Sequence, residues 1–168
     1  MRAIVRAEPG HTAAAWAVIE ASRAALDRAG ISQWDDTYPS RAVVESDIAK
    51  GTLYVLEEAG VTACITLDSI QDPAYARVAW TIPEPVLVVH RLCVDPTAQG
   101  RGLARELMTF AEAFAREHGY RGIRLDAFSG NPRALNLYRH RGYSDVGEVF
   151  FPRRDLPFRC FERAVDDR

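Results

Sequence analysis

The sequence contains no run of apolar residues long enough to cross a membrane. A membrane-spanning helix needs about 20 consecutive apolar residues, and charged or polar side chains interrupt every apolar stretch of this chain well before that length. The N-terminal residues 1–6 carry charges but not the apolar centre of a secretory signal peptide. From these absences we expect a cytoplasmic protein.

Cysteines are few, and basic residues do not gather into a stripe. Cys64, Cys93 and Cys160 lack the spacing of metal ligands, so we expect reduced, packed thiols and no metal. The 21 lysines and arginines are scattered among 23 acidic residues, and the net charge is −2. Nucleic acid is therefore not an expected partner.

The chain is predicted to form one domain over residues 1–168, because no repeat or linker divides it and its length can bury a core. Helical spacing of apolar residues predicts four helices, at 13–29, 41–50, 103–118 and 132–141. Short apolar runs predict strands at 4–5, 53–57, 61–68, 86–94, 123–127, 143–151 and 158–161. Residues 69–85 carry three prolines, and within them only 78–80 is a candidate to extend the sheet.

A glycine-rich turn joins the apolar run Val86 to Val94 to the amphipathic stretch that begins at Leu103. Such a turn leaves the first N–H groups of the helix unpaired at the positive end of its dipole, which suits a phosphate. The turn has no Gly-Lys-Ser/Thr, which disfavours a P-loop, and Arg105 replaces the third glycine of a dinucleotide fingerprint. What remains is a turn of small residues whose backbone would bind a pyrophosphate without a metal.

The turn reads Gln99-x-x-Gly102-x-Ala104 and follows a strand ending in residues 92–96. This pattern resembles the acetyl-CoA loop of the GNAT superfamily of N-acetyltransferases. Residues 131–138, followed by Arg141-Gly142-Tyr143, resemble the helix that comes next in that family. The resemblance implies an α/β fold of the GNAT type, with a central twisted mixed sheet and helices on both faces. It also implies an enzyme that uses acetyl-CoA.

The resemblance further implies where the coenzyme binds. The backbone near Leu92 and Val94 would pair with the pantetheine arm, at a gap between two parallel strands. Asn131 would contact pantetheine, and a simple helix N-cap is the equal alternative for this residue. The N–H groups that would hold the pyrophosphate belong to Gln99, Gly100, Arg101, Gly102, Leu103 and Ala104.

Direct attack of an amine on the thioester requires a base and an acid. Tyr138 occupies the family's tyrosine position and is the candidate acid for the departing thiolate; the alternative is a core aromatic residue. His90 is the candidate base, because strand alternation would place it on the same face as Leu92 and Val94, and a neutral imidazole can accept a proton. The alternative is a packed strand histidine.

The segment Ile31 to Pro39 is unusually aromatic and carries two acids. Trp34 and Tyr38 are candidates to wall the acceptor pocket, and Asp35 or Asp36 to attract a cationic amine; a loop packed by its own tryptophan is the alternative. The predicted function is acetyl transfer to a primary amine of a small molecule or peptide. A non-catalytic CoA-binding module is the alternative, and a transferase acting on RNA is disfavoured by the charge. The acceptor, the acyl group and the oligomeric state, with a homodimer as one option, stay open.

Overall fold

The computed structural model describes residues 1–166, and the chain divides into two compact units. The first unit comprises Met1–Gly30, Trp34–Leu67 and His90–Ala111. The second comprises Ile31–Gln33, Asp68–Val89 and the described residues from Glu112 onward. The single domain expected over the whole chain stays a prediction. Within residues 1–166, no helix is both long and apolar enough to cross a bilayer.

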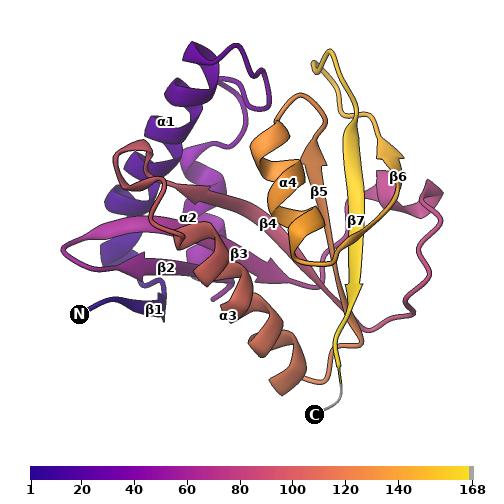
Figure 1. Cartoon of the computed structure of the whole chain (residues 1–168). Helices are drawn as coiled ribbons and strands as arrows, with labels where there is room; N and C mark the ends of the chain where they lie inside the picture. Colours follow the sequence, from indigo (N-terminus) through magenta and orange to yellow (C-terminus); the bar gives the residue numbers. More distant parts are fainter. Residues whose placement is uncertain (167–168) are drawn as a thin grey trace. The chain divides into compact units, whose positions relative to one another are not determined.

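Seven strands form one mixed sheet in the order β1-β2-β3-β4-β5-β7-β6 (Figure 1). The strands are β1 (Ala3–Arg6), β2 (Leu53–Glu57), β3 (Val61–Asp68), β4 (Val86–Val94), β5 (Gly122–Phe128), β6 (Ser144–Val149) and β7 (Phe158–Ala164). The helices are α1 (Thr12–Arg28), α2 (Arg41–Ala49), α3 (Leu103–Glu117) and α4 (Pro132–His140), with 3₁₀ turns η1 (Pro9–His11), η2 (Pro73–Arg77) and η3 (Pro96–Ala98). Strands β4 and β5 pair in parallel, whereas β1–β2, β2–β3, β5–β7 and β7–β6 are antiparallel. The predicted fold class is confirmed.

In the first unit, helices cover both faces of strand β2. Successive side chains of a strand point to opposite faces. Val55 lies in a buried cluster with Ile19 of α1 and Ile48 of α2. The ring of the preceding residue, Tyr54, lies 5.0 Å from that of Phe110 in α3, measured between centroids. Helices α1 and α2 therefore pack on one face of β2 and α3 on the other.

The second unit is layered in the same way around β5 and β7. The ring of Tyr138 in α4 lies 5.8 Å from that of Phe161, which is fully buried on β7. The adjacent residue, Cys160, faces the other side and shares a buried cluster with Tyr75 and Phe128. Helix α4 thus covers one face of this half of the sheet, and the η2 segment covers the other.

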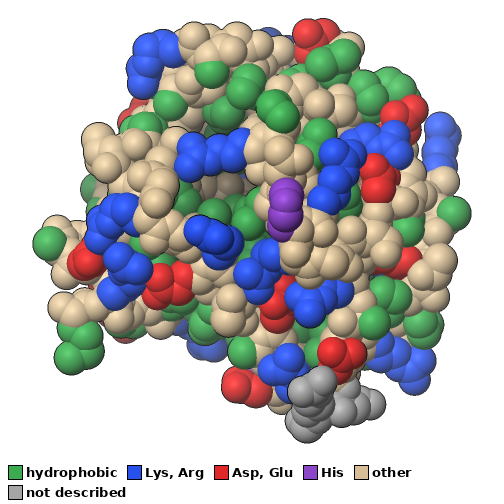
Figure 2. All heavy atoms as spheres, viewed as in Figure 1, with side chains coloured by type: hydrophobic (Ala, Val, Ile, Leu, Met, Phe, Trp, Pro, Cys, Tyr) green, Lys and Arg blue, Asp and Glu red, His purple; other side chains and the backbone are tan. Residues whose placement is uncertain are grey.

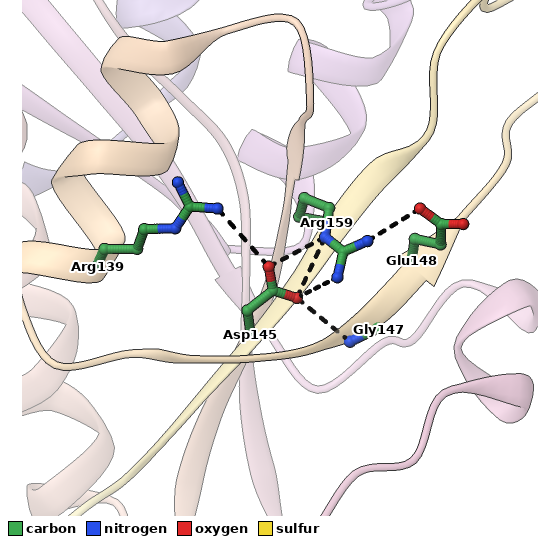
Figure 3. A network of polar contacts seen from close by, with 5 residues as sticks. All are labelled: Arg139, Asp145, Gly147, Glu148 and Arg159. Atoms are coloured by element: carbon green, nitrogen blue, oxygen red, sulfur yellow. Dashed lines mark hydrogen bonds and ion pairs between the residues drawn. The ribbon is translucent and has the colours of Figure 1, made fainter.

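Strand β6 forms one edge of the sheet, and a charged network lies along it (Figure 3). Arg159 donates to Asp145 at 2.8 and 3.0 Å and to Glu148 at 2.9 Å, and Arg139 lies 3.8 Å from Asp145. The pairing register shifts between Asp145 and Gly147. A bulge and charged side chains both discourage another strand from adding to an edge.

The segment 78–80 does not extend the sheet, so that prediction is wrong. The chain runs through η2 and then a hydrogen-bonded turn, in which the indole N–H of Trp80 donates to the carbonyl of Tyr75 at 2.9 Å. The guanidinium of Arg124 lies 4.6 Å from the centre of the Trp80 ring. The side chain of Trp80 therefore stabilises a turn and makes a cation–π contact, and its apolar neighbours do not form a strand.

Candidate functional site

The predicted coenzyme loop lies in the first unit, between β4 and α3. Asp95 begins it by accepting a hydrogen bond from the N–H of Thr97 at 2.8 Å, which caps η3. Gly100 and Gly102 then take φ angles of +80° and +79°. Glycine adopts this left-handed region without a steric penalty. These turns bring the chain directly into α3 at Leu103, so the strand–turn–helix arrangement predicted from the sequence is confirmed.

The first turn of α3 presents backbone donors to the loop. The first helical hydrogen bond runs from the N–H of Glu106 to the carbonyl of Gly102, at 3.0 Å. The N–H groups of Leu103, Ala104 and Arg105 therefore precede the helical ladder. The side chain of Leu103 is buried, so this residue offers only its main chain. Such a helix start suits an anionic group such as a pyrophosphate.

The side chain of Arg101 is engaged by an acid from the β2–β3 turn. Its guanidinium hydrogen-bonds the carboxylate of Glu58, which also lies 3.5 Å from Arg2. The hydrogen bond from Arg101 is the main cause that lowers the pKa of Glu58 below its ordinary value. In this arrangement Glu58 balances the positive charge that Arg101 brings to the loop. The partner lies 43 residues away in sequence, and no local pattern identifies it.

Strand β4 runs from Val86 to Val94 but contains a left-handed residue, Arg91, whose φ is +47°. A non-glycine residue in the left-handed region costs about 1–3 kcal/mol and persists only where its surroundings hold it. Arg91 lies between His90 and Leu92. The alternation of side chains between the two faces of an extended strand therefore cannot be assumed to continue from His90 to Leu92. The inference that His90 shares a face with Leu92 and Val94 is therefore not supported. His90 is half-buried, and its role as a base stays a prediction.

The end of β4 is tied to α1. The hydroxyl of Ser22, itself buried, donates to the carbonyl of Val94 at 3.1 Å. A carbonyl has two lone pairs, so this bond leaves Val94 able to accept a second donor. Between the two residues expected to meet pantetheine, Cys93 packs with its sulfur 3.3 Å from that of Cys64. Both thiols, like that of Cys160, are free and buried, as predicted.

The predicted acceptor loop is packed by its own residues. Trp34 is only 9% exposed and belongs to the core of the first unit. The Asp35 carboxylate accepts from the N–H groups of Thr37 and Tyr38, at 2.7 and 3.0 Å, and so holds the turn. Tyr38 is 41% exposed. Of the residues proposed for the acceptor, Tyr38 is thus more open to solvent than Trp34.

A buried ion pair joins this loop to the left-handed residue of β4. The guanidinium of Arg91 donates to one carboxylate oxygen of Asp47 through Nε at 2.8 Å and Nη2 at 2.7 Å, and through Nη1 to the Tyr38 hydroxyl at 2.8 Å. Thr66 donates to the same carboxylate oxygen at 2.8 Å. Burial alone would lower the pKa of Arg91, but Tyr38 and Asp47 together raise it. The sequence signal for this pair was a charged residue, next to His90, in a strand whose other residues are apolar.

Asn131 lies in the second unit at the start of α4. Its side-chain oxygen accepts from the N–H of Ala134 at 3.2 Å, and its side-chain nitrogen donates to Gln33 at 2.9 Å. The first contact is that of a helix N-cap, so that alternative is confirmed. Contact of Asn131 with pantetheine stays a prediction.

Tyr138 also belongs to the second unit and is 5% exposed. Its ring packs against Phe161 and lies 5.9 Å from that of Tyr143. Burial, followed by the charge of Asp126, raises the pKa of Tyr138 well above its ordinary value. The phenol therefore keeps its proton across the neutral range, as an acid must before it acts. A thiol is ordinarily more acidic than a phenol, so this raised pKa makes proton transfer from Tyr138 to a departing thiolate less favourable, and the role of Tyr138 as the acid stays a prediction.

Basic side chains do not form a stripe on the face drawn in Figure 2, where acidic and apolar side chains lie among them. Across residues 1–166, no group of three or more His, Cys, Asp or Glu side chains is placed to hold a metal ion.

Acetyltransferases that are similar in sequence match part of the chain. Human N-acetyltransferase 8B is 34% identical over 71 residues, which is 42% of this chain and 31% of that protein. Streptothricin acetyltransferase of Streptomyces lavendulae is 32% identical over 73 residues, 44% of this chain and 39% of that protein. The chain therefore spans less than half the length of each of these relatives in the matched regions.

Solved structures match nearly the whole fold at low identity. A GNAT-family acetyltransferase from Streptococcus agalactiae superposes with a TM-score of 0.81 at 22% identity, covering 99% of this chain and 96% of that one. The Escherichia coli ribosomal-protein-S18-alanine N-acetyltransferase gives 0.74 at 15%, covering 100% and 96%. The protein yncA from Salmonella typhimurium, solved with its cofactor acetyl-CoA, gives 0.69 at 20%, covering 100% and 96%. At these identities the likeness shows the fold.

The model of the acetyltransferase (GNAT) family matches residues 16–143, which include β4, the glycine loop, α3 and α4. That range covers most of the chain and every element of the predicted coenzyme site. The chain therefore belongs to the acetyltransferase (GNAT) family.

Proposed function

We propose that this chain is an N-acetyltransferase, which transfers the acetyl group of acetyl-CoA to a primary amine of a small molecule or peptide. The observation that carries the proposal is the loop at Gly100 and Gly102. Its two left-handed residues lead into a helix start with unpaired N–H groups. Membership of the acetyltransferase family supports acetyl transfer. The likeness to yncA, described with acetyl-CoA, supports the choice of coenzyme.

In the proposed site, backbone N–H groups between Gln99 and Ala104 bind the pyrophosphate, and the main chain at Leu92 and Val94 lies along the pantetheine arm. Asn131 adds a polar contact to that arm. This mode of binding uses main-chain donors and the helix dipole, so it requires no metal ion.

In the proposed reaction, the neutral amine attacks the thioester carbonyl directly. His90, or a water that it orders, takes the proton from the amine nitrogen. The carbon–sulfur bond then breaks, and Tyr138 protonates the departing thiolate. Groups placed in this way contribute about 10²- to 10⁴-fold to a rate. No covalent enzyme intermediate is needed.

The acceptor is proposed only as a class, an amine beside the loop that carries Tyr38. The names of two matched proteins, a streptothricin acetyltransferase and a ribosomal-protein-S18-alanine N-acetyltransferase, include both a small molecule and an alanine of a protein. The carboxylate of Asp35 is proposed to attract a cationic amine, and Trp34 is proposed to form part of the pocket wall. A cytoplasmic location and a homodimer stay predictions.

The proposal is tested by release of free thiol from acetyl-CoA across a panel of primary amines. The panel contains a polyamine, an aminoglycoside, an amino-acid ester and a peptide with a free N-terminus. We expect turnover with at least one of them. Coenzyme binding without turnover on any amine would instead indicate a non-catalytic CoA-binding module.

Replacing Glu58 with glutamine is expected to tighten acetyl-CoA binding, because it releases Arg101 and removes a negative charge near the loop. The expected gain is about two- to fivefold, the size of one exposed ion pair, and it should shrink as salt is raised. The control is Glu57→Gln, which removes one negative charge from the same hairpin. Glu57 pairs with His11, so this change leaves the contact between Glu58 and Arg101 in place. Equal affinities of the two variants by calorimetry would contradict a role for Arg101 at the coenzyme.

A further inference from the structure

Arg91 stands at the centre of a polar cluster within the first unit, formed with Tyr38, Asp47 and Thr66. We name these four residues the Arg91 clamp. They come from the loop before α2, from α2, from β3 and from β4. The clamp therefore connects the proposed acceptor loop with the strand proposed to hold the thioester.

One arm of the clamp holds the main chain of β4. Arg91 has a left-handed backbone conformation. This conformation is unfavourable for a residue with a side chain, and it persists only where surrounding contacts hold it. Its guanidinium is fixed by two N–H groups on the same oxygen of Asp47, and Thr66 orients that carboxylate. Asp47 is 6% exposed, so the pair is shielded from water and salt.

The other arm holds Tyr38. The loop is already anchored at its start, since Trp34 lies in the core and Arg23 donates to the carbonyl of Asp35 at 2.8 Å. Toward its end, the Tyr38 hydroxyl accepts from Nη1 of Arg91. That bond fixes the ring that is otherwise the most exposed aromatic group of the loop.

The clamp is not suited to bind an acidic substrate. The charge of Arg91 is balanced at 2.7 Å by Asp47, and three contacts already engage its guanidinium. A second carboxylate would have to compete with a buried, oriented partner. The chemistry of the cluster therefore favours positioning over binding.

We propose that Arg91 is a positioning residue for acetyl transfer, which fixes Tyr38 in the acceptor loop and the turn of β4 next to His90 as one rigid arrangement. This inference rests on the proposed function. It predicts that damage to the Tyr38 arm affects the acceptor and leaves the coenzyme unaffected, whereas damage to Arg91 affects the acceptor and the chemical step together.

The test compares Tyr38→Phe and Arg91→Lys with the wild type. Tyr38→Phe removes one hydrogen bond, so we expect the KM for the best amine of the panel to rise about five- to tenfold. The kcat of this variant and its dissociation constant for acetyl-CoA should stay within about twofold of the wild-type values, a difference within ordinary experimental scatter. Arg91→Lys keeps the positive charge but removes the planar guanidinium, which contacts Asp47 and Tyr38 at the same time. It should therefore raise the acceptor KM further and also lower kcat.

The matched control is Arg41→Lys, the same change at an exposed ion pair of α2 with Glu45. It should leave all three constants unchanged. Hydrogen exchange of the amides of residues 34–38 provides a readout that needs no substrate. Exchange should accelerate in Tyr38→Phe and Arg91→Lys and stay unchanged in Arg41→Lys.

The outcomes separate the two proposals. A wild type that turns over an amine, with a Tyr38→Phe variant of unchanged acceptor KM and unchanged exchange, overturns the inference and leaves the function intact. Equal losses in kcat, acceptor KM and coenzyme affinity would show a merely structural role and overturn it as well. A wild type that acetylates no amine overturns the role in acetyl transfer together with the function, and the exchange comparison still decides whether Arg91 holds the loop.

Discussion

Replacing Gly102 with alanine is expected to weaken acetyl-CoA binding by about a hundredfold. The proposed loop directs several N–H groups at the pyrophosphate, and each hydrogen bond to a charged group is worth about 1.5–3 kcal/mol. Gly102 has a φ of +79°, and an added Cβ would meet only the flexible side chain of Arg105, at 3.7 Å. The change therefore acts on the path of the backbone, and calorimetric titration measures its effect on binding.

Gly30→Ala is the matched control for this change. Gly30 ends α1 with a φ of +73° and has no atom within 4 Å of an added Cβ. Both variants should lose about 1 kcal/mol of folding free energy, the ordinary cost of alanine in this conformation. Only Gly102→Ala should lose coenzyme affinity. If both variants bind acetyl-CoA as the wild type does, the loop does not hold the coenzyme.

Replacing Tyr138 with phenylalanine is expected to lower kcat about a hundredfold while the affinity for acetyl-CoA is retained, because only the proton donor is removed. Burial and Asp126 raise the pKa of this phenol, so its acid form persists below that raised value and is lost only above it. Wild-type kcat should therefore show no loss from this group up to about pH 10, the ordinary pKa of tyrosine. Single-turnover rates across pH provide the measurement.

Tyr143→Phe is the control for the loss of a buried tyrosine hydroxyl in the same unit. Tyr143 is 4% exposed, and its hydroxyl donates to Glu112 at 3.2 Å. Its removal should reduce the free energy of unfolding by about 1 kcal/mol, the usual worth of one hydrogen bond, and leave kcat unchanged. A Tyr138→Phe variant that behaves like Tyr143→Phe would rule out Tyr138 as the acid.

The parts of the fold that the sequence predicted correctly follow from local rules. Ser40 and Asn131 cap helices because their side chains reach the next turn. The loop was recognisable because Gly100 and Gly102 supply conformations that other residues avoid. In each case a few neighbouring residues determine the structure.

The features that were missed depend on contacts between distant residues. Arg91 and Asp47 are 44 residues apart, and Glu58 and Arg101 are 43 apart. Periodicity cannot anticipate a left-handed residue inside a strand, so the alternation that placed His90 on the face of Leu92 cannot be carried through Arg91. Residues 78–80, a strand candidate in the sequence, form no strand, because Trp80 finds its partners, Tyr75 and Arg124, outside its own segment.

The central claim is that the backbone between Gln99 and Ala104 binds the pyrophosphate of acetyl-CoA. Its most direct test is a pair of calorimetric titrations of the folded wild type, one with acetyl-CoA and one with acetyl-pantetheine, which carries the same thioester but no pyrophosphate. The account predicts measurable binding of acetyl-CoA and at least a hundredfold weaker binding of acetyl-pantetheine, for a loss of about 3 kcal/mol or more. Equal affinities for the two, or no heat with acetyl-CoA at millimolar concentration, would contradict it.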